Sequence, residues 1–295
     1  MKIHGKRSRL GTIQSIQNFR SRQASLYRLI PNMVTLAALC AGLTGMRFAL
    51  ENRFSEAFMA VFLAAVLDGL DGRIARLIGA TSKFGAELDS LADFVSFGVA
   101  PAFILYLWVL PPLDGVTAAV WSSTTIRMSW AVALIYAASM ALRLARFNAT
   151  LDDQNRPAWM NRYFVGVPAP MASALAFMPM IYQIVIPEVN LRQPLVIDLW
   201  LLVVSGLMVS RIPTFSAKRM TLSNQWVVPI LMVALVMVAG LATAPWLTFL
   251  VIGTLYFLSI PLTWWFAHQP DSTAPDSVKL VEVPPSNQDE QEPRF

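Results

Sequence analysis

About eight apolar stretches, each close to the length of a membrane-crossing α-helix, dominate this chain of 295 residues. A spanning helix needs about 20 mostly apolar residues. The expected spans are 29–50, 55–79, 84–110, 129–148, 165–187, 195–211, 225–243 and 246–266. Inside a bilayer a helix satisfies its own backbone hydrogen bonds. The pattern therefore predicts an all-α, polytopic integral membrane protein.

The composition argues against a soluble enzyme and against a nucleic-acid partner. Hydrophobic residues make up 56% of the chain and charged residues 14%, whereas a soluble domain carries about 25% charged residues. The net charge is +5, but seven of the 23 basic residues form an arm before the first span, free of acidic residues, and anionic lipid head groups attract such an arm. The single cysteine, Cys40, excludes a cysteine-rich zinc site, and both histidines lie outside the spans.

The charge distribution divides the chain into three regions. A basic cytoplasmic arm covers 1–28, in which a short interfacial helix and a disordered tail fit about equally well, and the transmembrane domain covers 29–266. Residues 267–295 are acidic and proline-rich, which predicts a disordered tail. Lysine and arginine gather at the span ends on the side of the N-terminal arm, so both termini are expected in the cytoplasm.

Four aspartates flank the turn between the second and third spans. They are Asp68, Asp71, Asp89 and Asp93. The first two share one helix face at i,i+3 spacing, and the last two share another at i,i+4 spacing. The pairs 71/89 and 68/93 are both centred near residue 80, so an antiparallel helical hairpin turning at 79–82 brings the four carboxylates together at two levels.

Clustered carboxylates repel one another unless cations neutralise them. Hard divalent cations prefer oxygen ligands, and shared carboxylates can hold two metals about 3.5–4 Å apart, which suits phosphoryl substitution. The alternatives are a salt-bridge network or a proton relay, but the nearby cations are few: Arg73, Arg76 and Lys83. Gly72 and Gly85 beside the acids leave room for a ligand or for helix packing.

These residues resemble the signature of the CDP-alcohol phosphatidyltransferase family, D-x2-D-G-x2-A-R-x8-G-x3-D-x3-D. All eight fixed positions are present: Asp68, Asp71, Gly72, Ala75, Arg76, Gly85, Asp89 and Asp93. The flanking segments IPNMVTL (30–36), ELDSLADFVSFGVAPA (87–102) and RLARFN (143–148) are similar to one branch, the bacterial CDP-diacylglycerol–serine O-phosphatidyltransferases. The resemblance covers about residues 25–215.

The resemblance implies a six-helix catalytic core, a homodimer, and an active site open to the cytoplasm in the bacterial inner membrane. It implies two Mg or Mn ions, one on Asp68, Asp71 and Asp89 and the other on Asp68, Asp89 and Asp93, with Asp93 as the general base. It also implies a set of residues that contact CDP-diacylglycerol. That set is Asn32, Thr35, Gly72, Arg76, Ser82 and Gly85.

The implied reaction transfers the phosphatidyl group of CDP-diacylglycerol to the hydroxyl of L-serine, giving phosphatidylserine and CMP, with membrane lipids as the other partners. Arg143 and Arg146 end the fourth span and either bind the acceptor or a lipid phosphate, or only anchor the helix at the membrane surface. Two other functions stay open. One is a sister enzyme using glycerol 3-phosphate or inositol phosphate, and the remote one is an ion-coupled transporter.

Overall fold

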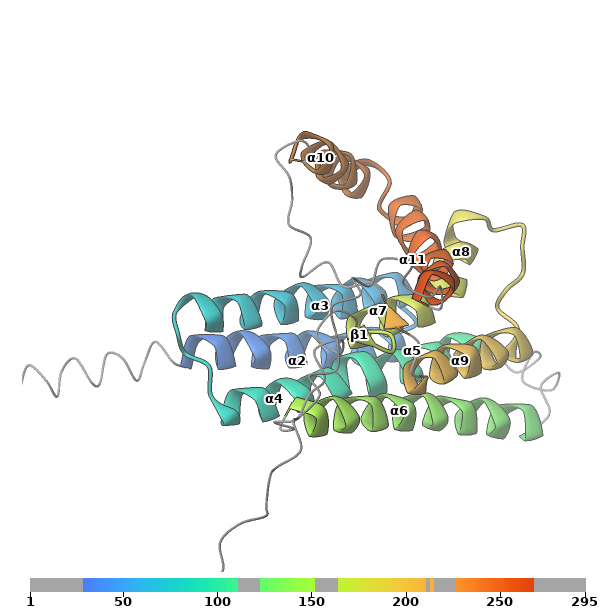
Figure 1. Cartoon of the computed structure of the whole chain (residues 1–295). Helices are drawn as coiled ribbons and strands as arrows, with labels where there is room; N and C mark the ends of the chain where they lie inside the picture. The colour runs from blue at the N-terminus through green and yellow to red at the C-terminus, as the bar shows by residue number, and fades with distance from the viewer. Residues whose placement is uncertain (1–28, 111–122, 152–163, 211–212, 215–226, 268–295) are drawn as a thin grey trace, which may run out of the picture.

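The computed structural model describes residues 29–110, 123–151, 164–210, 213–214 and 227–267, which are almost entirely helical (Figure 1). The elements are α2 (Leu29–Leu50), α3 (Phe54–Leu77), α4 (Lys83–Asp93), η1 (Phe94–Val99), α5 (Ala100–Val109), α6 (Ser123–Leu151), β1 (Phe164–Val165), α7 (Ala169–Ala176), α8 (Met178–Val185), α9 (Pro194–Val209), β2 (Pro213–Thr214), α10 (Val227–Thr243) and α11 (Pro245–Ala267). The two short strands pair antiparallel. The all-α fold class is confirmed.

The helix bounds follow the expected spans closely. Within the described residues, four helical stretches are long and apolar enough to cross a membrane: Leu29–Leu50, Lys83–Val109, Thr124–Thr150 and Pro245–Thr263. Helix α3 has 24 residues but carries several charged side chains, and the other expected spans correspond to α7 with α8, to α9 and to α10. The chain is thus a multi-pass membrane protein, and the count of eight crossings stays a prediction.

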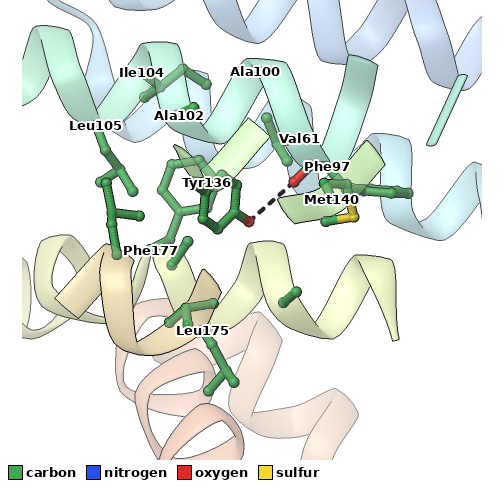
Figure 2. Close-up of a cluster of buried hydrophobic side chains, with 14 of the residues drawn as sticks. Val61, Phe97, Ala100, Ala102, Ile104, Leu105, Tyr136, Met140, Leu175 and Phe177 are labelled. Atoms are coloured by element: carbon green, nitrogen blue, oxygen red, sulfur yellow. Dashed lines mark hydrogen bonds between the residues drawn. The ribbon is translucent and has the colours of Figure 1, made fainter. Parts of the chain in front are cut away.

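The third expected span changes its helical winding before Pro101. Its middle section, η1, is a π-helix that joins α4 to α5. Pro101 has no N–H to offer the carbonyl of Phe97 four residues earlier, and the Tyr136 hydroxyl donates a 3.1 Å hydrogen bond to that carbonyl instead (Figure 2). Tyr136 is fully buried among apolar side chains, so α6 both fills the core and completes the backbone of the neighbouring helix.

The fifth expected span is divided into α7 and α8. The helix is interrupted at Phe177, and Pro179 lies in the first turn of α8. Pro179 leaves the Leu175 carbonyl without its helical donor, and the indole N–H of Trp200 on α9 donates to it over 2.8 Å. A side chain from an adjacent helix again replaces the hydrogen bond that a proline removes.

Small residues let α2 pack closely against its neighbours. A Cβ added to Gly45 would lie 2.9 Å from the Ala57 carbonyl oxygen of α3, and one added to Gly42 would lie 2.6 Å from Ser96 Oγ of η1. Buried alanines complete the α2–α3 interface. Such small-residue stripes allow helix backbones to approach closely in membranes. This packing fixes α2 beside the two helices that carry the aspartates.

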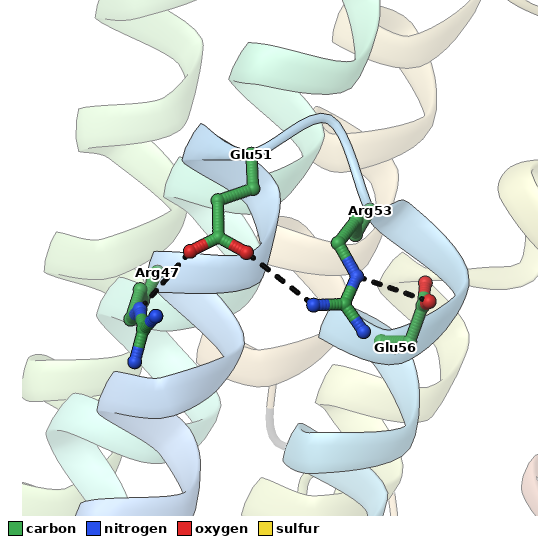
Figure 3. Close-up of polar contacts among 4 residues, drawn as sticks. All are labelled: Arg47, Glu51, Arg53 and Glu56. Carbon is green, nitrogen blue, oxygen red and sulfur yellow. Dashed lines mark hydrogen bonds and ion pairs between the residues drawn. The ribbon is translucent and has the colours of Figure 1, made fainter.

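The turn between α2 and α3 is held by a chain of exposed ion pairs. Arg47 pairs with Glu51 over 3.1 Å, Glu51 with Arg53 over 3.4 Å, and Arg53 with Glu56 over 3.2 Å (Figure 3). The Arg53 guanidinium also lies 4.6 Å from the centre of the Phe48 ring. This turn precedes the N-terminal end of α3, whereas Asp68 and Asp71 lie toward the C-terminal end of that helix.

Helices α6 and α9 are joined through a polar contact in an apolar interface. Asp198 accepts a 2.8 Å hydrogen bond from the Ser129 hydroxyl, so the charged residue of the sixth expected span pairs two helices.

The basic arm 1–28 lies outside the described residues, as does the acidic tail apart from residue 267. The interfacial helix and the disordered tail stay predictions.

Candidate active site

The hairpin between α3 and α4 has the form expected from the spacing of its aspartates. Helix α3 ends at Leu77, and Gly79 takes a φ of +62°, a left-handed conformation that favours glycine. Ser82 then caps α4, because its hydroxyl accepts a 3.0 Å hydrogen bond from the Gly85 N–H. The turn reverses the chain within the expected 79–82 segment.

The hairpin brings the aspartates together. Asp68, Asp71 and Asp89 each offer a carboxylate oxygen, and these oxygens all lie within 4.8 Å of one another. Asp93 joins them through a direct interaction with Asp68. Asp71 is buried, and the other three are partly buried. Asp68 therefore connects the cluster, because it interacts with both Asp89 and Asp93.

The four carboxylates have little positive charge to compensate them. Within the part of the chain that the structure describes, every ion pair closer than 4.0 Å involves Glu51 or Glu56, at the opposite end of the hairpin. Arg76 is exposed, and its Nε donates a 3.0 Å hydrogen bond to the Gly72 carbonyl. Arg143 acts electrostatically on Asp93 but forms no ion pair with it within 4.0 Å. Grouped carboxylates with so little compensating charge are oxygen donors that suit hard divalent ions. The residues present therefore fit the expected metal.

The first turns of α2 face this cluster. The Thr35 hydroxyl donates to Asp71 Oδ2 over 2.6 Å, a contact that sequence reasoning did not foresee. A Cβ added to Gly85 would lie 3.1 Å from both Asn32 Oδ1 and Ser82 Oγ. Thus the residues expected to contact CDP-diacylglycerol on α2 lie beside those on α4.

The other expected donor contacts lie on α3. Gly72 is exposed, and a Cβ added there would meet nothing within 4 Å, so the backbone beside Asp71 is open to a ligand. Arg76 is exposed one turn further along. Gly72 and Arg76 are thus open to a ligand, whereas the hydroxyls of Thr35 and Ser82 are already hydrogen-bonded. Thr35 donates to Asp71, and Ser82 accepts from the Gly85 N–H.

The two arginines of α6 have different surroundings. Arg146 donates to the carbonyl oxygens of Val209 (2.8 Å), Ser210 (3.2 Å) and Met208 (3.4 Å). These carbonyls end α9, so Arg146 satisfies groups that a helix terminus leaves without donors. Arg143 uses its Nε on the Val167 carbonyl, at 2.5 Å.

Arg143 also interacts electrostatically with Asp93. No described residue accepts a hydrogen bond from the terminal nitrogens of its guanidinium. Of the two arginines, Arg143 is therefore the one with donors available beside the aspartates.

A polar contact fixes the C-terminal end of α6 against α4. The side-chain amide of Asn148 donates a 3.0 Å hydrogen bond to the Ser90 hydroxyl, and Ser90 follows Asp89 directly in sequence. The same α6 segment thus carries Arg143 beside Asp93 and Asn148 beside Ser90. Sequence reasoning named Arg143 but had no signal for the pairing of Asn148 with Ser90, because 58 residues separate them.

Comparison with known proteins agrees with this site. The family model for CDP-alcohol phosphatidyltransferase matches residues 28–209, and that for CDP-alcohol phosphatidyltransferase 2 matches residues 225–261. The first match contains all four aspartates and both α6 arginines, and the second covers most of α10 and α11.

Curated relatives are similar over most of the chain. A CDP-diacylglycerol–serine O-phosphatidyltransferase of Mycobacterium leprae is 35% identical over 257 residues, covering 86% of this chain and 81% of the relative. One of Mycobacterium tuberculosis is 35% identical over 256 residues, covering 85% of each chain. One of Helicobacter pylori is 37% identical over 147 residues, covering 50% of this chain and 55% of the relative.

Proposed function

Because the chain belongs to the CDP-alcohol phosphatidyltransferase family, we propose that it transfers the phosphatidyl group of CDP-diacylglycerol to the hydroxyl of L-serine, giving phosphatidylserine and CMP. The observation that carries the choice of serine is the likeness to relatives named for that reaction, which extends over more than four fifths of both chains. The aspartate cluster supports the phosphatidyl transfer itself.

The carboxylates would hold two divalent cations, Mg²⁺ or Mn²⁺. Asp68, Asp71 and Asp89 would hold the first, which the mutual approach of their oxygens within 4.8 Å supports. Asp68 and Asp89 with Asp93 would hold the second, supported by the interactions of Asp68 with both other residues. Bound there, the cations would neutralise the donor's diphosphate and stabilise the departing CMP.

The CDP group of the donor would lie against the α3–α4 turn and the start of α2. Gly72 and Gly85 allow its approach to the backbone, and Arg76 offers a planar guanidinium to phosphate. Asn32 would contact the donor too, which its position across from Gly85 supports. Thr35 and Ser82 belong to the same wall, although in the structure their hydroxyls support Asp71 and the first turn of α4.

Asp93 would be the general base. The hydroxyl of free serine is a weak nucleophile at neutral pH, and a nearby carboxylate can take its proton during attack. The serine oxygen then bonds to the phosphorus that bears the diacylglycerol. The bond between that phosphorus and the CMP oxygen breaks, and the proton passes to Asp93. Arg143 beside Asp93 would bind the acceptor, whereas the bonds of Arg146 to the end of α9 favour a structural role.

We place the site on the cytoplasmic side of the bacterial inner membrane, in a homodimer with both termini in the cytoplasm. The orientation is supported by the positions of Arg73, Arg76, Arg143 and Arg146, which lie near the aspartate end of their helices. Exposed apolar residues along α10 are suited to contact with membrane lipid.

The purified full-length protein, supplied with CDP-diacylglycerol, Mg²⁺ or Mn²⁺ and labelled L-serine, tests the proposal. We expect labelled phosphatidylserine and an equal amount of CMP, both abolished by chelation of the metal. Replacing Asp93 with Asn should stop turnover while the protein still binds the donor lipid. Turnover of glycerol 3-phosphate or inositol phosphate in place of serine would identify a sister enzyme. No metal-dependent CMP release with any alcohol would refute phosphatidyl transfer.

A further inference from the structure

Helix α11 turns one narrow face toward the helical bundle. Gly253 and Ile260 on this face are buried, and Tyr256 lies between them at helical spacing. A Cβ added to Gly253 would clash with the sulfur of Met178 on α8. The missing side chain thus lets α11 pack closely against α8 (Figure 1). Tyr256 is partly buried and packs against the hydrophobic core.

The Tyr256 hydroxyl is exceptional among the described residues. It is their one buried side-chain nitrogen or oxygen without a hydrogen-bond partner. A buried tyrosine hydroxyl normally finds a partner, because an unpaired polar group in an apolar setting is costly. The hydroxyl interacts electrostatically with the guanidinium of Arg143. Arg143 interacts with both Tyr256 and Asp93. Tyr256 therefore connects the proposed active site to α11, a helix that carries none of the family signature.

The Tyr256 hydroxyl and the Arg143 guanidinium both have hydrogen-bond donors without an acceptor among the described residues. Tyr256 has an O–H to donate, and the terminal nitrogens of Arg143 have N–H groups for which no described residue provides an acceptor. A guanidinium and a phenol hydroxyl within electrostatic reach of each other suit an anionic oxygen, carried by a carboxylate or by a phosphate. Here the acceptor's carboxylate and the donor's diphosphate are the two sources of such an oxygen.

We propose that the Tyr256 hydroxyl, together with Arg143, binds the carboxylate of the amino-acid acceptor and so contributes to acceptor specificity; this rests on the proposed function. The acceptor's carboxylate is favoured over the donor, because Arg143 interacts with Asp93, the proposed base, which must lie within hydrogen-bond reach of the acceptor's hydroxyl. Gly85 and Asn32, which are proposed to contact the CDP group, lie instead by the first turn of α4. Gly85 and Asp93 are about 12 Å apart along α4 at 1.5 Å per residue.

The test compares the full-length wild type with Tyr256→Phe. Tyr182→Phe is the matched control, because Tyr182 is 36% exposed on α8. Losing a hydrogen bond to a charged group should raise the KM for L-serine about tenfold or more. We expect kcat and the KM for CDP-diacylglycerol to change little. We also expect no loss of thermal stability, because the hydroxyl has no described protein partner.

A second measurement is the Kd of L-serine by calorimetry, with serinol, which lacks the carboxylate, as the comparison ligand. The wild type should bind serine more tightly than serinol, and Tyr256→Phe should reduce that preference. An unchanged KM and Kd for serine, or a clear fall in the melting temperature, would overturn the inference. A rise confined to the KM for CDP-diacylglycerol would assign the hydroxyl to phosphate and overturn it too. If the wild type forms no phosphatidylserine, the proposed function is refuted. The inference is then tested by calorimetry alone, through the preference for serine over serinol and its reduction in Tyr256→Phe.

Discussion

Replacing Thr35 with Val should weaken metal binding without disturbing the fold. The Thr35 side chain is buried, and its hydroxyl donates to Asp71 Oδ2 over 2.6 Å. Valine keeps the shape and removes this short hydrogen bond to a carboxylate. Hydrogen bonds to charged groups contribute about 1.5–3 kcal/mol, and 1.4 kcal/mol corresponds to about a tenfold change in an equilibrium constant. Loss of a group that orients a metal ligand costs about 10–100-fold in metal affinity.

We therefore expect the Kd for Mn²⁺, measured by electron paramagnetic resonance, to rise at least about tenfold in Thr35→Val. Thr35→Ser, which restores the hydroxyl, should return close to the wild type. Thr44→Val is the matched control on the same helix, because the exposed Thr44 hydroxyl donates to the Cys40 carbonyl of its own helix and to no other described residue. Equal Mn²⁺ affinity in Thr35→Val and the wild type would refute the reasoning. If the KM for CDP-diacylglycerol rose instead, Thr35 would contact the donor directly.

Three further substitutions probe the frame of the site through melting temperatures in detergent. Arg146→Ala should lower the melting temperature, because three carbonyls at the end of α9 lose their donor, and an unchanged value would leave Arg146 free to bind substrate. Tyr136→Phe should destabilise the protein by about 1–3 kcal/mol, because the Phe97 carbonyl is left unpaired; a neutral effect would contradict its backbone role. Gly79→Ala should cost about 1–2 kcal/mol from its φ of +62° alone, since a Cβ there meets nothing within 4 Å, and full stability would show that the turn relaxes.

The aspartate hairpin was predictable because helical periodicity alone determines which residues share a face. The i,i+3 and i,i+4 pairs on either side of a short turn leave few alternatives, and the structure brings Asp68 together with Asp71, Asp89 and Asp93. The same holds for the helix bounds, since apolar length and turn residues are local properties. The prediction of α2 over 29–50 matches the helix Leu29–Leu50.

Contacts between distant segments were not predictable from the sequence. Pro179 indicates that the Leu175 carbonyl lacks its helical donor, but only the packing of α9 against α7 shows that Trp200 replaces this donor. The two α6 arginines look alike in sequence, yet the end of α9 occupies Arg146 and leaves the terminal nitrogens of Arg143 available. Tyr256 carried no signal at all, because a lone tyrosine in an apolar helix is ordinary.

Helix α6 positions its neighbours and, in the proposed function, carries an acceptor-binding residue apart from the metal site. Its Tyr136 completes the backbone of the third span, its Arg146 caps α9, and its Asn148 contacts Ser90 beside Asp89. These contacts fix the position of α6 against both α4 and α9, and the same helix carries Arg143, which interacts electrostatically with Asp93. The proposed metal ligands all belong to the α3–α4 hairpin, whereas Arg143 and Tyr256 belong to α6 and α11. A change of acceptor could therefore arise on α6 and α11 while the signature hairpin stays intact, which explains why the signature by itself does not identify the acceptor.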